Sequence, residues 1–208
     1  MLDVSQDPST STPTPSDTAT VFAFDETAEL SRLQPEARWS LRLQESDATA
    51  IGEIAGFDLT GPINSCRAGT DDGDTARRPS WSVRLGPNEW LLAASRDELA
   101  ARQTALARGL ANRPHGLVEI SDRQVAFRLS GPSATSVLSS GCPLDLHAQS
   151  FPVDMATRTV FAKCEIVLHR AGESEFRIQV WRSFSNYFTS FIAETAAMYS
   201  ALNQQKGV

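Results

Sequence analysis

The sequence feature that most constrains the fold is a pair of β-type runs that flank a turn at residues 86–88. Residues 81–85, Trp-Ser-Val-Arg-Leu, place apolar side chains at every second position, and residues 89–94 form a second, mostly apolar run. The Gly-Pro-Asn sequence between them supplies turn residues, since glycine and asparagine tolerate unusual backbone angles and proline presets its own. The segment therefore predicts a β-hairpin.

Strand and helix patterns surround this hairpin in the first half of the chain. The predicted elements are a strand at residues 39–44, a helix at 46–55, the hairpin, a helix from 95 to about 110 and a strand at 117–120. Ser95 and Glu98 form a Ser-x-x-Glu capping box, which favours a helix start at this point. The resulting order, β-α-β-β-α-β, is ferredoxin-like.

The second half predicts a similar alternation that ends in an amphipathic helix. Strands are expected at residues 125–130, 158–161, 165–169 and 176–180, and a helix is expected between Gly131 and Gly141. Pro132 suits the first helical position, where a missing N–H costs nothing. Large apolar residues then recur at spacings of three and four, as one face of a helix requires: Phe184, Tyr187, Phe188, Phe191, Ile192 and Tyr199. This order, β-α-β-β-β-α, completes an α+β fold of two ferredoxin-like-type halves, with antiparallel sheets packed against helices.

Composition divides the chain into two lobes and two tails. Residues 1–20 are rich in Ser, Thr, Pro and Asp and are expected to be a disordered tail, because they bury too little apolar surface to offset the entropy of ordering. Residues 21–120 form the expected N-terminal α/β lobe, with a mobile loop at 67–79, and residues 121–201 form the C-terminal lobe. Residues 202–208 are a short tail.

Charge and cysteine content exclude several classes of function. The 208 residues carry a net charge of -6, which disfavours nucleic acid because phosphate backbones require a basic surface. No apolar run approaches the roughly 20 residues that cross a bilayer, and the N-terminal residues lack the pattern of a secretory signal. Three cysteines, an odd number without close pairing, fit a reducing cytoplasm. We therefore expect a cytoplasmic protein that contacts neither nucleic acid nor membrane.

Motifs that carry catalysis or bind cofactors are missing from the sequence. Cys142 and His147 form a closely spaced metal-type pair, whereas structural zinc needs four ligands. Neither a glycine-rich phosphate loop nor a nucleophile elbow occurs. Cys164 has Lys163 beside it, which favours a thiolate, although buried inert thiols are common. We predict no catalytic, cofactor-binding or metal-binding residue in this chain.

One short segment has the composition of a protein interface. Trp181, Arg182 and Phe184 lead together into the last predicted helix, and tryptophan and arginine are enriched where interfaces bury anchors. The alternative, that these side chains belong to the core or to the ordinary surface, stays open at the level of sequence. We expect Trp90, which lies in an apolar strand, to be a core residue.

Four segments resemble the gamma subunit of heterotetrameric sarcosine oxidases, in this order and spacing. They are Leu-Gly-Pro-Asn-Glu-Trp-Leu-Leu at 85–92, Ser-Asp-Arg to Leu-Ser-Gly-Pro at 121–132, Gly-Cys-Pro-Leu-Asp-Leu at 141–146 and Arg-Ser-Phe-Ser-Asn-Tyr at 182–187. The resemblance covers residues 37–198. It implies a non-catalytic subunit of a complex that oxidatively demethylates sarcosine to glycine, releases hydrogen peroxide and passes the one-carbon unit to tetrahydrofolate.

The resemblance also implies partners and cofactors. The partners are the alpha, beta and delta subunits of the oxidase. The nicotinamide and flavin groups (NAD, FAD and FMN) belong to the two larger subunits and zinc to the smallest, and tetrahydrofolate also binds outside this chain. No cofactor is implied for this chain itself.

Residues 121–196 are similar, more distantly, to the folate-binding domain of glycine-cleavage aminomethyltransferases. Asp145 falls where that family has the acid of an Asn-Asp pair, but Leu144 replaces the amide. The acidic hairpin of that family is shortened here, and only Glu165 remains near its place. A carboxylate there steadies a charged folate intermediate during one-carbon transfer. A stand-alone folate-dependent aminomethyltransferase-like protein is therefore the alternative hypothesis, and a thiol enzyme that uses Cys164 is the third.

Overall fold

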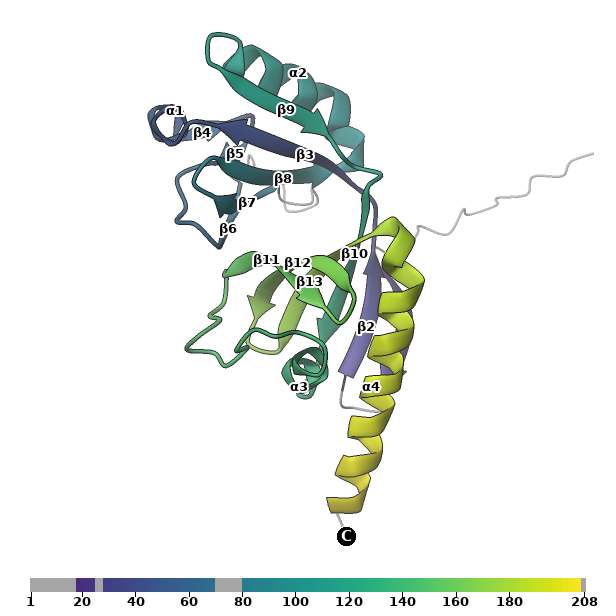
Figure 1. Cartoon of the computed structure of the whole chain (residues 1–208). Helices are drawn as coiled ribbons and strands as arrows, with labels where there is room; N and C mark the ends of the chain where they lie inside the picture. Colours follow the sequence, from purple (N-terminus) through teal and green to yellow (C-terminus); the bar gives the residue numbers. More distant parts are fainter. Residues whose placement is uncertain (1–17, 25–27, 70–79, 207–208) are drawn as a thin grey trace, which may run out of the picture.

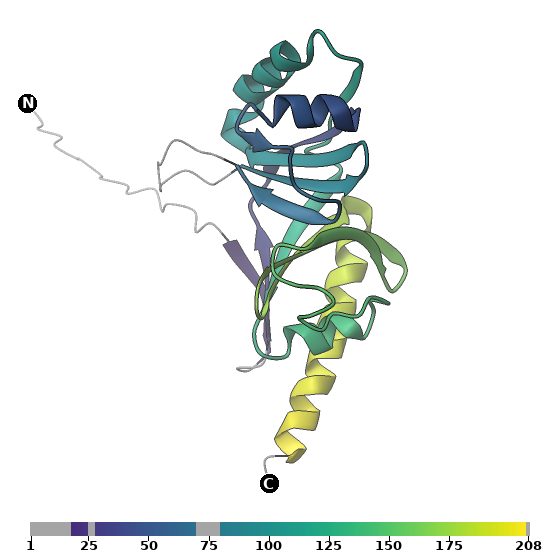
Figure 2. The same ribbon diagram turned by 90° about the vertical axis from the view of Figure 1, so that its left-hand side faces the viewer.

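The computed structural model describes residues 18–24, 28–69 and 80–206. Two antiparallel sheets face each other, and helices cover the outer face of each sheet (Figures 1 and 2). Within the described part of the chain, no helix combines the length and the apolar character needed to cross a bilayer. The prediction of an α+β fold with antiparallel sheets packed against helices is confirmed.

The first sheet has five strands in the order β6-β7-β8-β3-β9. Their bounds are β6 (Ser65–Ala68), β7 (Trp81–Gly86), β8 (Glu89–Ser95), β3 (Glu36–Leu43) and β9 (His115–Glu119). Helices α1 (Glu45–Ile51) and α2 (Leu99–Leu110) pack on its outer face, and a small ribbon of β4 (Glu53–Ile54) and β5 (Phe57–Asp58) lies beside them. The predicted hairpin is confirmed as β7 and β8, which pair in antiparallel register.

The second sheet has six strands in the order β1-β2-β10-β13-β12-β11. Their bounds are β1 (Thr18–Phe24), β2 (Ala28–Leu33), β10 (Gln124–Ser130), β13 (Glu175–Trp181), β12 (Cys164–Gly172) and β11 (Ala156–Phe161). Helix α3 (Ala134–Ser139) and the long α4 (Ser185–Lys206) cover its outer face (Figure 1). The 3-10 turn η2 (Arg182–Phe184) connects β13 to α4.

Strand β8 shows how the two sheets are held together. Successive side chains of a strand point to opposite faces, so Trp90 and Leu92 pack under the helices, whereas Leu91 and Ala93 face the second sheet. A small apolar cluster between the sheets joins them to Val167 of β12. Because β8 is buried on both faces, its sequence reads as a continuous apolar run rather than an alternation. The core position predicted for Trp90 is confirmed.

The expected division at residue 21 is wrong for the first strands of the chain. Strands β1 and β2, which begin at Thr18 and Ala28, belong to the second sheet, where Leu30 of β2 pairs with Leu129 of β10. Residues 18–20 of the expected tail therefore lie in a strand, while residues 1–17 lie outside the described residues. The remaining domain boundaries and the ferredoxin-like order of each half stay predictions.

Several predicted ends of helices are corrected by local geometry. The helix expected at 46–55 ends at Ile51, because Gly52 takes a left-handed φ of 69°. Ser95 makes no capping hydrogen bond; a 3-10 turn, η1 (Arg96–Glu98), precedes α2, and Glu98 pairs with Arg102 instead. Pro132 lies before α3 rather than at its first position, and α4 continues through residues 202–206 of the expected tail. Most of the loop predicted at 67–79, namely 70–79, lies outside the described residues.

The aromatic face predicted for the last helix is confirmed at its centre. Phe188 and Ile192 are fully buried, and the Phe188 ring lies 5.2 Å from the Phe161 ring, centre to centre. Tyr187, Phe191 and Tyr199 are partly buried against the same core. Phe184 departs from the pattern, because it belongs to η2 and is 41% exposed.

Candidate functional site

A buried carboxylate joins the two sheets at the centre of the molecule. Glu36 of β3 accepts hydrogen bonds from Arg38 Nη2 at 3.0 Å and from Trp81 Nε1 at 3.1 Å. It also accepts one from Arg177 Nη2, which comes from β13 of the facing sheet. The Arg177 guanidinium lies over the Trp81 ring, 5.0 Å from its centre. The carboxylate of Glu36 therefore pairs with two arginines and also holds the indole of Trp81 in position.

The strand pattern explains why these charges are buried. Glu36 and Arg38 alternate with Ala37 and Trp39, which face the helix-covered core, so both charged side chains point toward the second sheet. Arg38 is 1% exposed, and its Nη1 donates to the carbonyl of Gln124 at 2.7 Å. The guanidinium is stabilised in this buried position because Nη1 and Nη2 each donate to an oxygen and Glu36 supplies an opposite charge, although Nε has no partner among the described residues.

Opposing effects act on the pKa of Glu36. Burial by itself raises the pKa, but the charges of Arg177 and Arg38, together with hydrogen bonds from Arg177 and Trp81, outweigh it and lower the pKa. Burial also lowers the pKa of Arg38, and Glu36 partly offsets this. The group therefore stays ionised, as two cations and one anion, at neutral pH.

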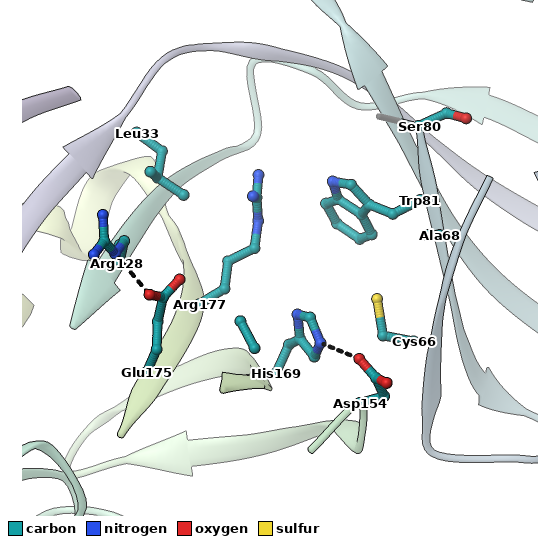
Figure 3. Close-up of a pocket in the computed structure, with 11 residues that line it drawn as sticks. Leu33, Cys66, Ala68, Ser80, Trp81, Arg128, Asp154, His169, Glu175 and Arg177 are labelled. Carbon is teal, nitrogen blue, oxygen red and sulfur yellow. Dashed lines mark ion pairs between the residues drawn. The ribbon is translucent and has the colours of Figure 1, made fainter. Parts of the chain in front are cut away.

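A pocket of about 280 Å³ opens beside this group, between the sheets (Figure 3). Its wall is formed by residues of β2, β6, β7, β10, β12 and β13 and of the segments that precede β7 and β11: Leu33, Cys66, Ala68, Ser80, Trp81, Arg128, Asp154, His169, Ala171, Glu175 and Arg177. Both sheets contribute, so the pocket exists only where they are docked together.

His169, on the wall of the pocket, has a strongly lowered pKa. Its Nε2 lies 3.8 Å from Asp154 Oδ1. Burial, and next the nearby charge of Arg177, lower the pKa of His169 to about 4, although Asp154 acts in the opposite direction. The imidazole is therefore neutral at physiological pH. Arg128 and Glu175 form their own ion pair at 3.1 Å on the same wall.

Cys66, His169 and Asp154 share one side of the pocket, which brings together the residue types of a thiol hydrolase (Figure 3). Burial raises the pKa of the Cys66 thiol to about 12. A thiol that is so weak an acid does not transfer its proton to an imidazole that is so weak a base, and nucleophilic attack requires the thiolate. In residues 18–24, 28–69 and 80–206, no group of three or more His, Cys, Asp or Glu side chains is arranged to hold a metal ion.

The two carboxylates expected from the aminomethyltransferase resemblance are engaged separately. Asp145 accepts the backbone N–H of His147 at 2.9 Å and the hydroxyl of Ser150 at 2.5 Å, and these bonds, that of Ser150 first, lower its pKa. Glu165 accepts the indole N–H of Trp181 at 3.3 Å and pairs with an arginine of β11. Their hydrogen bonds and ion pairs among the described residues go to different partners, and neither residue lines the pocket.

Cys164, the residue of the thiol-enzyme hypothesis, lies in the core of the second sheet. Its side chain is buried and donates a hydrogen bond to the carbonyl of Phe161 at 3.1 Å. Burial raises the pKa of its thiol, which opposes the thiolate that Lys163 would favour. This geometry is that of a structural thiol.

Trp181, Arg182 and Phe184 lie together on the surface where β13 passes into η2. Trp181 is 39% exposed and Phe184 is 41% exposed, while Arg182 pairs with Asp122 at 3.3 Å. The guanidinium of Arg123 lies over the Trp181 ring, 5.2 Å from its centre. The three residues are therefore part of the surface rather than of the core.

Sequence reasoning missed Glu36, Arg38, Arg177 and His169. The sequence contains a hint of burial only for Glu36 and Arg38, because both alternate with apolar residues along a strand that is mostly buried. Nothing in the sequence connects Glu36 with Arg177, which is 141 residues away.

The arrangement of two facing sheets with outer helices is shared with known proteins. Glycine cleavage system aminomethyltransferase T from Bartonella henselae superimposes with a TM-score of 0.62 at 15% identity, over 81% of this chain and 46% of that one. This likeness establishes the class of the fold. A chain of the heterotetrameric sarcosine oxidase from Corynebacterium sp. U-96, solved in complex with pyrrole 2-carboxylate, matches with a TM-score of 0.69 at 25% identity, over 86% and 88% of the two chains.

Sequence comparison identifies the family. The profile described as "Sarcosine oxidase, gamma subunit family" matches residues 70–198, and the chain belongs to this family. Sarcosine oxidase subunit gamma of Corynebacterium sp. strain U-96 is 34% identical over 73% of this chain and 64% of its own length. The subunit of strain P-1 is 32% identical over 56% of this chain and 57% of its own length. The aligned parts thus span less than two thirds of these relatives.

Proposed function

We propose that this chain is the gamma subunit of a cytoplasmic heterotetrameric sarcosine oxidase and that it acts as a scaffold without an active site of its own. The observation that carries the proposal is the family match over residues 70–198, to which the similarity to a chain of the Corynebacterium enzyme adds support. The assembled enzyme oxidatively demethylates sarcosine to glycine, produces hydrogen peroxide and passes the one-carbon unit to tetrahydrofolate.

The partners in this proposal are the alpha, beta and delta subunits. NAD, FAD, FMN, zinc and tetrahydrofolate bind to those subunits and not to this chain. The hydrogen bonds of three acidic side chains support this assignment. Asp145 holds its own loop together, Glu165 bonds to Trp181, and Glu36 joins the two sheets. Each of these carboxylates has a structural role among the described residues.

We assign the contact with a partner subunit to Trp181, Arg182 and Phe184. Exposed aromatic side chains beside an arginine have the composition of an interface anchor. The Trp181 ring is held in place by Arg123 and Glu165, so it loses little freedom when a partner covers it. A partner surface that buries both rings and carries an acidic group near Arg182 fits this arrangement.

Copurification tests both parts of the proposal. The tagged full-length chain, produced together with the other three subunits, recovers them as a complex with sarcosine-dependent peroxide production. Recovery of the tagged chain alone contradicts the proposed function. Binding of tetrahydrofolate to the isolated chain, measured by calorimetry, supports the aminomethyltransferase-like alternative instead.

A double substitution tests the contact surface. Replacing Trp181 and Phe184 by alanine is expected to weaken subunit recovery by roughly thirty-fold, the effect of losing about 2 kcal/mol at an interface anchor. Met198→Ala is the matched control, because Met198 is also an exposed apolar residue but lies on α4, away from this surface. Equal recovery of the double variant and the control refutes the contact surface and leaves the subunit assignment standing.

A further inference from the structure

The buried group beside the pocket has an unbalanced charge. Arg38 and Arg177 share one carboxylate, that of Glu36, so the group carries one excess positive charge. The side chains of Arg38, Glu36 and Arg177 are 1%, 8% and 24% exposed, so water screens this excess only in part. A buried charge of this kind is normally balanced by an opposite one.

The remaining charged residues of the pocket wall do not supply that balance. Arg128 and Glu175 neutralise each other in an ion pair at 3.1 Å. The carboxylate of Asp154 is 74% exposed, so its field is screened by solvent. His169 is uncharged at neutral pH, because its pKa is lowered to about 4. The excess positive charge therefore remains with the arginines, and Arg177 is the one that faces the pocket.

Arg177 has hydrogen-bonding capacity left on that side. Its Nη2 donates to Glu36, and one face of its guanidinium covers Trp81. Among the described residues, the one hydrogen bond of this guanidinium is that from Nη2 to Glu36, and its buried Nε has no partner. Figure 3 shows the guanidinium between Leu33 and Trp81, in the middle of the lining residues. The donor therefore lies where an occupant of the pocket meets it.

The rest of the wall sets the size and polarity of such an occupant. Leu33, Ala68, Ala171 and the Trp81 ring provide apolar surface. The volume of about 280 Å³ equals that of about nine water molecules, taking about 30 Å³ for each. A molecule with one small ring or a short chain fits this space, whereas a nucleotide or a folate does not.

We propose that this pocket binds a small monocarboxylic acid, with the carboxylate on Arg177 and the apolar body between Leu33 and Trp81. A carboxylate matches the planar donor edge of a guanidinium and balances one excess charge. A cation would add to the excess, and a doubly charged anion would reverse it. The residues that meet the ligand come from both sheets, so occupation stabilises their docking by mass action.

The test uses the full-length chain labelled with ¹⁵N at the indole of its four tryptophans and titrated with benzoate. The Trp81 signal, assigned with a Trp81→Phe variant, is expected to move, with a dissociation constant of about a millimolar. Benzamide has the same shape without the charge and is expected to leave the signal in place. No displacement at about ten times that benzoate concentration overturns the proposal, as does equal displacement by benzamide.

Two arginine variants connect the binding to the charge. Arg177→Lys keeps a positive charge but loses the planar donors, and it is expected to weaken benzoate binding by about ten-fold or more. Arg158→Gln is the matched control, because Arg158 also forms an ion pair between the two sheets but does not line the pocket. Unchanged affinity in the lysine variant, or an equal loss in the control, refutes the assignment. The isolated chain suffices, so the result does not depend on the proposed subunit function.

Discussion

Replacing Glu36 by glutamine removes the carboxylate that joins the two sheets while keeping its shape. The side chain accepts hydrogen bonds from Arg38, Trp81 and Arg177, and two of these donors carry a positive charge. A glutamine has one acceptor oxygen, so its amide N–H₂ must face at least one of the donors. The substitution therefore leaves two buried guanidinium groups without a counter-charge.

The expected loss follows from the burial of these groups. Removing one member of a buried ion pair costs about 3–5 kcal/mol, because the remaining charge stays in a poorly solvated position. Glu36 and Arg38 are both almost fully buried, and Arg177 is largely buried, so this range applies to them. Since a domain has a total stability of about 5–15 kcal/mol, the variant is expected to lose a large part of its free energy of unfolding.

Glu89→Gln is a matched control on the same two sheets. Glu89 of β8 also pairs with two arginines, Arg42 of the neighbouring strand β3 at 2.9 Å and Arg158 of the facing sheet at 2.6 Å. These arginines are 56% and 38% exposed, so water screens their charges, and the expected loss is about 1 kcal/mol or less. Because both glutamates pair with two arginines, a difference in stability loss between the two variants reports the effect of burial.

Urea unfolding, followed by tryptophan fluorescence and by circular dichroism, measures both variants, and coincident transitions show two-state behaviour. A loss for Glu36→Gln that does not exceed that of Glu89→Gln refutes the reasoning. The pH dependence provides a second check. The lowered pKa of Glu36 means that its stabilisation is present above the pH at which an unfolded glutamate titrates and is lost as the pH falls through the folded pKa. The difference between wild type and Glu36→Gln should therefore shrink in acid.

Three further outcomes are expected. The pKa of His169 falls from 6.5 to about 4 on folding, so the unfolded chain binds a proton at a higher pH than the folded chain does. The free energy of unfolding should therefore decrease by about 3 kcal/mol as the pH falls from 6.5 toward 4. In urea titrations, His169→Gln should remove this contribution to the pH dependence. Phe188→Ala should cost about 3–5 kcal/mol in the same assay, whereas Phe184→Ala, at an exposed position, should cost less than about 1 kcal/mol. The three buried cysteines should react with a thiol reagent only after unfolding, and rapid labelling of the native chain would contradict the packing described above.

The local elements could be predicted because their signals are contained in short stretches of sequence. The hairpin β7–β8 follows from apolar runs on each side of a Gly-Pro-Asn turn, and the core face of α4 follows from the spacing of residues such as Phe188 and Ile192. Predictions failed where one sequence pattern is compatible with two local structures. The Ser95–Glu98 spacing suits a capping box, but Glu98 instead pairs with Arg102, one turn further along.

The sequence by itself determined the α+β class and the segments that identify the family. Only the tertiary structure decided that β2 pairs with β10 and that Glu36 meets Arg177. The physical reason is that strand and helix patterns describe only the order within a short stretch of the chain. Alternation along a strand tells which side chains share a face, but not which distant strand that face will meet. The charge balance of the pocket, and hence the kind of molecule it suits, exists only after the two sheets have docked.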